Sequence, residues 1–177
     1  MPDALIVIDM QRAGFVDAPP KHDATGLIGR LNRLAAAVRT AGGTVIFVQH
    51  DGPAGDPFHP SLPGWQLVED LDIRTEDRIV RKTACDSFLG TNLESLLRWL
   101  GTDRLLVTGW ATDYCVDTTV RSALARYPTV VPSDGHTTSD RAHLLAAKII
   151  EHHNAIWADF IAPKGPAIVQ PCASLCF

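Results

Sequence analysis

The sequence predicts a three-layer α/β/α sandwich built around a central, mostly parallel sheet of about six strands. Short apolar runs of strand length alternate with segments of helical periodicity along the whole chain, and these runs lack the polar alternation of a half-exposed strand. Strands buried on both faces and separated by helices form parallel sheets with right-handed crossovers. With 177 residues, 46% of them hydrophobic, the chain can bury the core that such a domain needs.

Six apolar runs are the expected strands. The second is rich in β-branched residues, and the third is a short pair of residues that leads into Arg81 and Lys82. No internal repeat or linker interrupts the alternation, so we expect one domain over residues 1–177 with a tail from about residue 163. The expected strands cover residues 5–8, 44–49, 79–80, 104–108, 129–131 and 155–158.

Four helical patterns lie between and after these runs. The first has leucine and valine at helical spacing over residues 27–38. The second opens at Thr91, which has capping-box spacing to a glutamate three residues later. The third is expected to begin at Thr112, as its cap, and to run to about residue 126. Ser139 is expected to cap the fourth helix, which ends near residue 154.

Composition excludes several classes of function. The net charge is −4 and no basic cluster is present, which argues against a nucleic-acid partner. No apolar run approaches the length of a membrane-spanning helix, and the N-terminus lacks the basic region of a secretory signal. The cysteines do not form a disulfide framework for a chain of this size, so a cytoplasmic location is expected. Cys172 and Cys176 are spaced like a metal-binding or disulfide pair, but they lie in the expected tail without a second ligand pair nearby. We therefore expect no site there.

Three reactive side chains follow three expected strands. Asp9 comes after the first, Lys82 after the third, and Cys115 after the fourth, in the first turn of a helix. Taken singly, Asp9 also fits a turn former, Lys82 a solvated surface residue, and Cys115 a small buried apolar residue. Ligands bind at the carboxyl ends of parallel strands, where these three would meet. A carboxylate can take a thiol proton, and an ammonium and a helix N-terminus can stabilise the thiolate.

The segments around these residues resemble a known family. Residues 5–11 (LIVIDMQ), 82–91 (KTACDSFLGT) and 109–116 (GWATDYCV) are similar to the three signature segments of the isochorismatase-like cysteine hydrolases. That superfamily includes nicotinamidases, N-carbamoylsarcosine amidase and isochorismatases. The resemblance extends over about residues 4–160 and implies a Rossmann-like fold and a homo-oligomer, commonly a dimer or tetramer.

The resemblance also implies a site and a reaction. The catalytic triad would be Asp9, Lys82 and Cys115, with a cis peptide bond between Trp110 and Ala111. The backbone N–H groups of Ala111 and Cys115 would bind the oxyanion, and no cofactor would be required. The expected function is hydrolysis of a C–N bond in a small amide, ureido or carbamoyl compound through a thioester.

One departure from the family pattern concerns a metal. Nicotinamidases carry a metal-binding Asp-x-His after the second strand, whereas here Asp51 is followed two residues later by Pro53. His50 and His59 could still join Asp51 around an ion. Histidines in a Pro-rich loop are weak evidence for a metal site, however, and we expect no metal.

Aromatic residues near the triad are candidates for the substrate pocket. Phe15, Trp65 and Trp110 are each expected to line it, although a core or subunit-contact role fits Phe15 and Trp65 equally well. Gln11 is expected to hydrogen-bond near the site or to pack at the strand end. The loop over residues 52–64 is long enough to suggest a functional or mobile segment.

Three alternative hypotheses about the function remain. A papain-like arrangement of Cys115, His136 and Asp134 would leave Asp9 and Lys82 without a role. A thiol redox or sensor protein would use Cys115 with Cys85 as the resolving partner. An inactive binding module is disfavoured because all three reactive residues are present.

Overall fold

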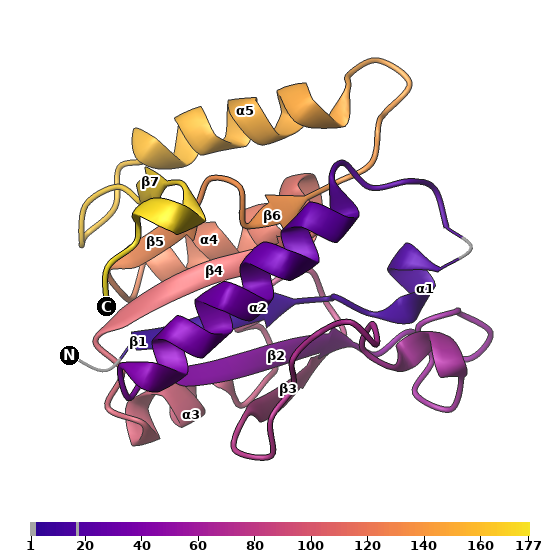
Figure 1. Cartoon of the computed structure of the whole chain (residues 1–177), viewed down its shortest axis with the longest axis horizontal. Helices are drawn as coiled ribbons and strands as arrows, with labels where there is room; N and C mark the ends of the chain where they lie inside the picture. The colour runs from indigo at the N-terminus through magenta and orange to yellow at the C-terminus, as the bar shows by residue number, and fades with distance from the viewer. Residues whose placement is uncertain (1–2, 17) are drawn as a thin grey trace.

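The alternating apolar runs pair side by side in a parallel sheet. In the computed structural model, which describes residues 3–16 and 18–177, the strand order is β3-β2-β1-β4-β5-β7, and β6 pairs with β4 (Figure 1). Every strand pairing in the described residues is parallel. The strands are β1 (Asp3–Ile8), β2 (Thr44–His50), β3 (Arg78–Lys82), β4 (Arg104–Trp110), β5 (Thr129–Pro132), β6 (His136–Thr137) and β7 (Ile168–Gln170).

Helices cover both faces of this sheet. The long helix α2 packs its leucine stripe on one face, while α3, α4 and the end of α5 pack on the other (Figure 1). None of the helices in the described residues is long and apolar enough to cross a membrane. The helices are α1 (Arg12–Phe15), α2 (Ala24–Thr40), α3 (Leu93–Trp99), α4 (Asp117–Leu124) and α5 (Ala146–Ala158), with single turns η1 (Pro63–Trp65), η2 (Thr112–Val116) and η3 (Cys172–Ser174).

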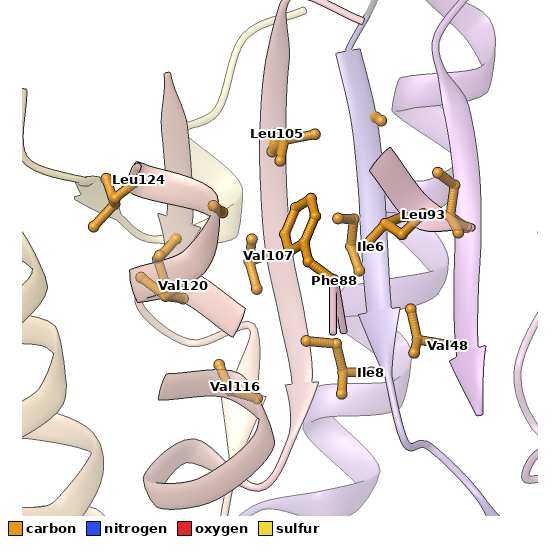
Figure 2. Close-up of a cluster of buried hydrophobic side chains, with 14 of the residues drawn as sticks. Ile6, Ile8, Val48, Phe88, Leu93, Leu105, Val107, Val116, Val120 and Leu124 are labelled. Carbon is orange, nitrogen blue, oxygen red and sulfur yellow. The ribbon is translucent and has the colours of Figure 1, made fainter. Parts of the chain in front are cut away.

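The uninterrupted apolar run in the central strand β1 reflects the burial of both of its faces. All six of its residues are buried; Asp3 pairs with Arg104, and from Ala4 to Ile8 successive side chains alternate between the two core clusters. Ile6 and Ile8 belong to the cluster that also contains Phe88 and Val116 (Figure 2). A strand that is buried on both faces needs apolar residues at every position, so the sequence pattern is a direct consequence of its place in the sheet.

The C-terminal third differs from the expectation. Residues 155–158, expected to be a strand, are the last turn of α5, and Trp157 points into the core. That helix begins at Ala146 rather than at Ser139, and the Asp140 carboxylate accepts the Ala146 N–H at 2.8 Å. The segment expected to be a tail contributes β7, which pairs with β5.

Candidate active site

The carboxyl ends of β1, β3 and β4 bring the three reactive side chains into contact. Lys82 Nζ lies 2.7 Å from Asp9 Oδ2 and 3.3 Å from Cys115 Sγ. The third acceptor around this amine is the Ala84 carbonyl oxygen, at 3.0 Å. Asp9 and Lys82 are each only 2% exposed. The ammonium therefore has one acceptor for each of its three N–H groups, and its side chain is shielded from solvent by these neighbours.

Local backbone geometry directs these side chains. Asp9 has φ 51°, in the left-handed region that Asp tolerates better than most residues, and its N–H donates to the Val48 carbonyl. Gly109 has φ 115°, and a Cβ there would collide with the Ile8 carbonyl oxygen. Only glycine allows β1 and β4 to approach this closely just before the turn that carries Cys115.

Cys115 lies in the π-helical turn η2, ahead of α4. The Val116 N–H donates to the Ala111 carbonyl, five residues back. Thr112 is not the cap that we expected, because its hydroxyl is hydrogen-bonded to His136 Nδ1 at 2.9 Å. The peptide bond between Trp110 and Ala111 is cis. The Ala111 N–H has no acceptor within the described chain, and the Cys115 N–H has none outside its own helical turn.

The electrostatics of the resting site differ from the expectation for a thiol at a helix start. Burial, and then the negative charge of Asp9, raise the pKa of Cys115, and the Lys82 ammonium only partly opposes this. Burial also raises the pKa of Asp9, against the effect of Lys82. Burial alone would lower the pKa of Lys82, but the charge of Asp9, the neighbouring Cys115 sulfur and the hydrogen bonds to both outweigh it, and the net shift is upward. The resting state therefore pairs a carboxylate with an ammonium beside a protonated thiol.

A cavity of about 480 Å³ opens onto these residues, within the usual size range of small-molecule sites. Asp9, Trp110, Ala111 and Cys115, all candidates from the sequence, belong to its wall. The remaining wall residues are His50, Asp56, Phe58, Thr83, Ala84, Cys85, Tyr114 and Arg141.

Three expected pocket residues lie elsewhere. Gln11 is fully buried, and its amide is used within the protein: it donates to the carbonyls of His50 and Trp65 and accepts the His50 N–H. Trp65 donates its indole N–H to Asp51 at 2.8 Å. Phe15 packs edge-on against Trp110, with ring centroids 6.1 Å apart. None of the three belongs to the wall of the cavity.

Reasoning from sequence missed Phe58, which with Tyr114 is one of two aromatic wall residues that were not expected. Its ring stacks on Trp110 at a centroid distance of 6.0 Å and an interplanar angle of 12°. It lies inside the Pro- and Gly-rich loop, where no periodicity marks a side chain as inward-facing. The only signal available was the length of that loop.

The papain-like alternative does not assemble. His136 is buried between the Thr112 hydroxyl and the Asn154 amide and is absent from the cavity wall. Asp134 instead lies 3.4 Å from Arg30. Burial lowers the pKa of His136 to about 4, so the ring is neutral near pH 7.

Two of the three residues considered for a metal, Asp51 and His59, are engaged otherwise. Asp51 accepts the Trp65 indole N–H and the Arg81 Nε–H, and its Oδ2 lies 2.7 Å from Arg81 Nη2 in an ion pair. His59 Nδ1 is hydrogen-bonded to Ser61. In the described part of the chain, no group of three or more His, Cys, Asp or Glu side chains is arranged to hold an ion. These side chains do not fit the nicotinamidase-type metal site.

The family follows from sequence comparison. Residues 3–159 match the family model of the isochorismatase domain. The chain belongs to the isochorismatase family. A streptothricin hydrolase of Streptomyces noursei is 37% identical over 138 residues, which cover 77% of this chain and 50% of that protein. The ureidoacrylate amidohydrolase RutB of Variovorax paradoxus is 33% identical over 156 residues, which cover 68% and 62% of the two chains.

Solved structures of the isochorismatase family share the fold. An isochorismatase from Pseudomonas putida superposes with a TM-score of 0.89 at 30% identity, covering 98% of this chain and 90% of that one. N-carbamoylsarcosine amidase from Thermoplasma acidophilum shares the fold at 22% identity, with a TM-score of 0.79 over 99% of both chains. The chain spans between half and two thirds of the length of the curated relatives named above.

Proposed function

We propose that this isochorismatase family member is a cysteine hydrolase that cleaves a C–N bond of a small amide, ureido or carbamoyl compound. One observation carries the proposal: the buried Lys82 amine touches both the Asp9 carboxylate and the Cys115 sulfur beside a cavity of ligand size. The names of the relatives, a streptothricin hydrolase and a ureidoacrylate amidohydrolase, support the same class of reaction.

The first half of the reaction is acyl transfer to sulfur. Asp9 Oδ1 is buried and accepts no hydrogen bond in the described chain, so it is the oxygen available for the Cys115 proton. As that proton moves, the negative charge passes from Asp9 to sulfur, where the Lys82 ammonium stabilises it. The sulfur attacks the substrate carbonyl carbon, and the carbonyl π electrons move to oxygen. The N–H groups of Ala111 and Cys115 bind that oxyanion, each contributing about 3–4 kcal/mol.

The second half releases both products. The tetrahedral intermediate collapses, the C–N bond breaks, and Asp9 returns its proton to the departing nitrogen. Water then gives a proton to Asp9 while its oxygen attacks the thioester, and the C–S bond breaks. Asp9 passes that proton to the Cys115 sulfur, which restores the resting state.

Ammonia release from a panel of small amides and ureido compounds tests this function. For any compound that the wild type hydrolyses, we expect Cys115→Ala to lose activity by about 10³-fold or more, since no nucleophile remains. Mass spectrometry of Cys115→Ala should also show no acyl adduct, whereas the wild type forms one on Cys115 during turnover. Full activity in Cys115→Ala would refute the nucleophile assignment.

A second candidate function rests on Cys85, which is exposed and lines the same cavity as Cys115. In a thiol-based peroxide sensor, peroxide would oxidise Cys115 to a sulfenic acid and leave as water. The Cys85 thiol would then displace a second water to form a disulfide. Peptide mapping after mild peroxide treatment separates the candidates, with Cys85→Ser as the control. A Cys85–Cys115 disulfide, together with no turnover of any amide, would favour the sensor.

Compartment and assembly belong to the same proposal. All four cysteines are free, which is typical of the reducing cytoplasm that we propose. We also propose a homo-oligomer, a dimer or a tetramer, to be measured by light scattering on the purified protein.

A further inference from the structure

A histidine that the proposed reaction does not use stands beside the triad. His50 ends β2 and pairs in register with Lys82 of β3. Side chains two residues apart on a strand share a face, so His50 lies on the same face as Val48, and Lys82 on the same face as Val80. Val48 and Val80 belong to one core cluster. The pleat therefore turns His50 and Lys82 toward the same side of the sheet, and His50 joins the cavity wall.

The His50 ring is held in place. Gln11 accepts its backbone N–H at 2.8 Å and donates to its carbonyl oxygen at 3.0 Å. The edge of the ring packs on Phe58, with centroids 6.0 Å apart and an interplanar angle of 77°. The Gln11 bonds fix the backbone that carries the ring, and the Phe58 contact restricts the ring itself, so less rotamer entropy is lost when a ligand binds.

The surroundings of its two nitrogens select a tautomer. Nδ1 is one of two buried side-chain polar atoms without a hydrogen-bond partner in the described residues, and the other is Asp9 Oδ1. An orphaned acceptor is less costly than an orphaned N–H, so the ring proton belongs on Nε2. Nε2 is not among the buried atoms that lack a hydrogen-bond partner. His50 thus offers an N–H donor to the cavity.

The position of this donor separates it from the oxyanion site. β2 and β4 lie on opposite sides of β1, so their backbones are about 10 Å apart at the usual strand spacing. The N–H groups of Ala111 and Cys115 follow β4, whereas His50 ends β2. The His50 donor therefore enters the cavity from a different strand end than the two oxyanion donors do.

We propose that His50 Nε2–H binds a second oxygen of the substrate, a carbonyl or carboxylate oxygen at the end remote from the scissile carbonyl. This proposal rests on the proposed function and narrows its substrate class. The preferred compounds carry an oxygen acceptor a few bonds beyond the C–N bond that is cleaved. A simple alkyl amide leaves the His50 donor unpaired and is a poorer ligand.

Alkylation of Cys115 tests this without requiring that the substrate be known. Two reagents of similar shape are compared: N-(iodoacetyl)glycinamide, which has a second carbonyl, and N-isobutyliodoacetamide, which has none. In both cases the Cys115 sulfur displaces iodide, the C–I bond breaks, and the thiol proton goes to Asp9 and then to buffer. The labelling rate of the Cys115 peptide is measured by mass spectrometry, so that reaction at Cys85 does not interfere.

We expect the wild type to prefer the glycinamide reagent by about three- to tenfold, as one hydrogen bond would give. Gln places its amide nitrogen where His has Nε2, and Asn places it where His has Nδ1. His50→Gln should therefore keep the preference within about twofold, while His50→Asn and His50→Leu should lose it. The readout is the ratio of the two labelling rates within each protein, so a general change in Cys115 reactivity, which both reagents share, does not affect it.

Each other outcome overturns a defined claim. No preference in the wild type, or a preserved preference in His50→Leu, would remove the second-oxygen site. Loss of preference in His50→Gln with its retention in His50→Asn would assign the donor to Nδ1 and refute the tautomer. Failure of both reagents to label Cys115 would instead count against Cys115 as the nucleophile, and so against the proposed function.

Discussion

Lys82 determines the charge state of the whole site. Its side chain is fully buried, and its ammonium is shared among Asp9, Cys115 and the Ala84 carbonyl. A buried charge is tolerated only when it is paired and hydrogen-bonded. Removing Lys82 alone would leave the Asp9 carboxylate uncompensated and raise its pKa further.

The pH dependence of kcat/KM should show this coupling. The reaction needs ionised Asp9, so activity is lost as pH falls through the pKa of Asp9. Burial raises that pKa, which places the acid limb at a higher pH than an ordinary carboxyl would. In Lys82→Met the limb should move further toward neutral pH and the plateau should fall by about 10²–10⁴-fold. An acid limb at the ordinary position of an aspartate would contradict the assignment.

The double variant Asp9→Asn/Lys82→Met separates folding from catalysis. It replaces a buried ion pair by neutral groups of similar size, which is often neutral or stabilising. We expect urea unfolding to show stability within about 1–2 kcal/mol of the wild type, while activity stays at the level of the weaker single variant. Recovery of activity in the double variant would mean that neither side chain takes part in proton transfer.

At the scale of elements, the turn that carries Cys115 is attached to α5 by one neutral histidine. The Asn154 amide donates to the Ser133 carbonyl, which turns its oxygen toward His136 Nε2 at 3.0 Å. Nε2 must then carry the proton, and Nδ1 accepts from the Thr112 hydroxyl at 2.9 Å. This network fixes η2 from the side opposite the cavity.

Stability should therefore depend on pH through His136. Its pKa is about 4 in the folded chain, below the ordinary value of 6.5 in the unfolded chain. The unfolded state binds the extra proton, so stability is full above pH 6.5 and falls as pH drops toward 4, by about 3 kcal/mol in all. Urea unfolding at pH 7.5 and pH 5 measures the slope. His136→Gln should lose most of this slope, and an equal slope in both proteins would refute it.

Sequence patterns predicted the strands in the middle of the sheet. They failed where contacts between residues far apart in the sequence determine the structure or the role of a side chain. β1 and β4 are buried on both faces, and their apolar runs marked them correctly. The meeting of Asp9, Lys82 and Cys115 followed because the ends of parallel strands converge. The role of Gln11 could not be read, since it depends on the carbonyls of His50 and Trp65, which are 39 and 54 residues away. Residues 155–158 were misassigned because a short apolar run fits a strand or a helix equally well.

At the scale of the whole molecule, the C-terminal segment completes the sheet. β7 covers the outer edge of β5, and beyond it the Cys172 N–H donates to the Asp134 carboxylate at 2.7 Å. Asp134 also accepts from Arg30 of α2 through its backbone carbonyl. The last fifteen residues thus join the sheet to a helix far from them in the sequence.

Truncation after residue 162 should destabilise the protein without touching the triad. We expect the free energy of unfolding to fall by roughly 2–4 kcal/mol, from lost backbone pairing and exposure of β5. Urea unfolding followed by tryptophan fluorescence measures this, with Cys172→Ala in the full chain as a control that keeps the pairing. An unchanged midpoint would show that β7 contributes nothing to stability.

The placement of Lys82 has a consequence for the newly made chain. Lys82 ends β3, which is the outermost strand on its side of the sheet and pairs with β2 alone. Before β3 has docked on β2, the chain already holds the Cys115 sulfur and the Asp9 carboxylate. It lacks the Lys82 ammonium that stabilises negative charge as a proton moves between them. In the proposed reaction, Cys115 would therefore gain its reactivity only once β3 has docked and the molecule has finished folding.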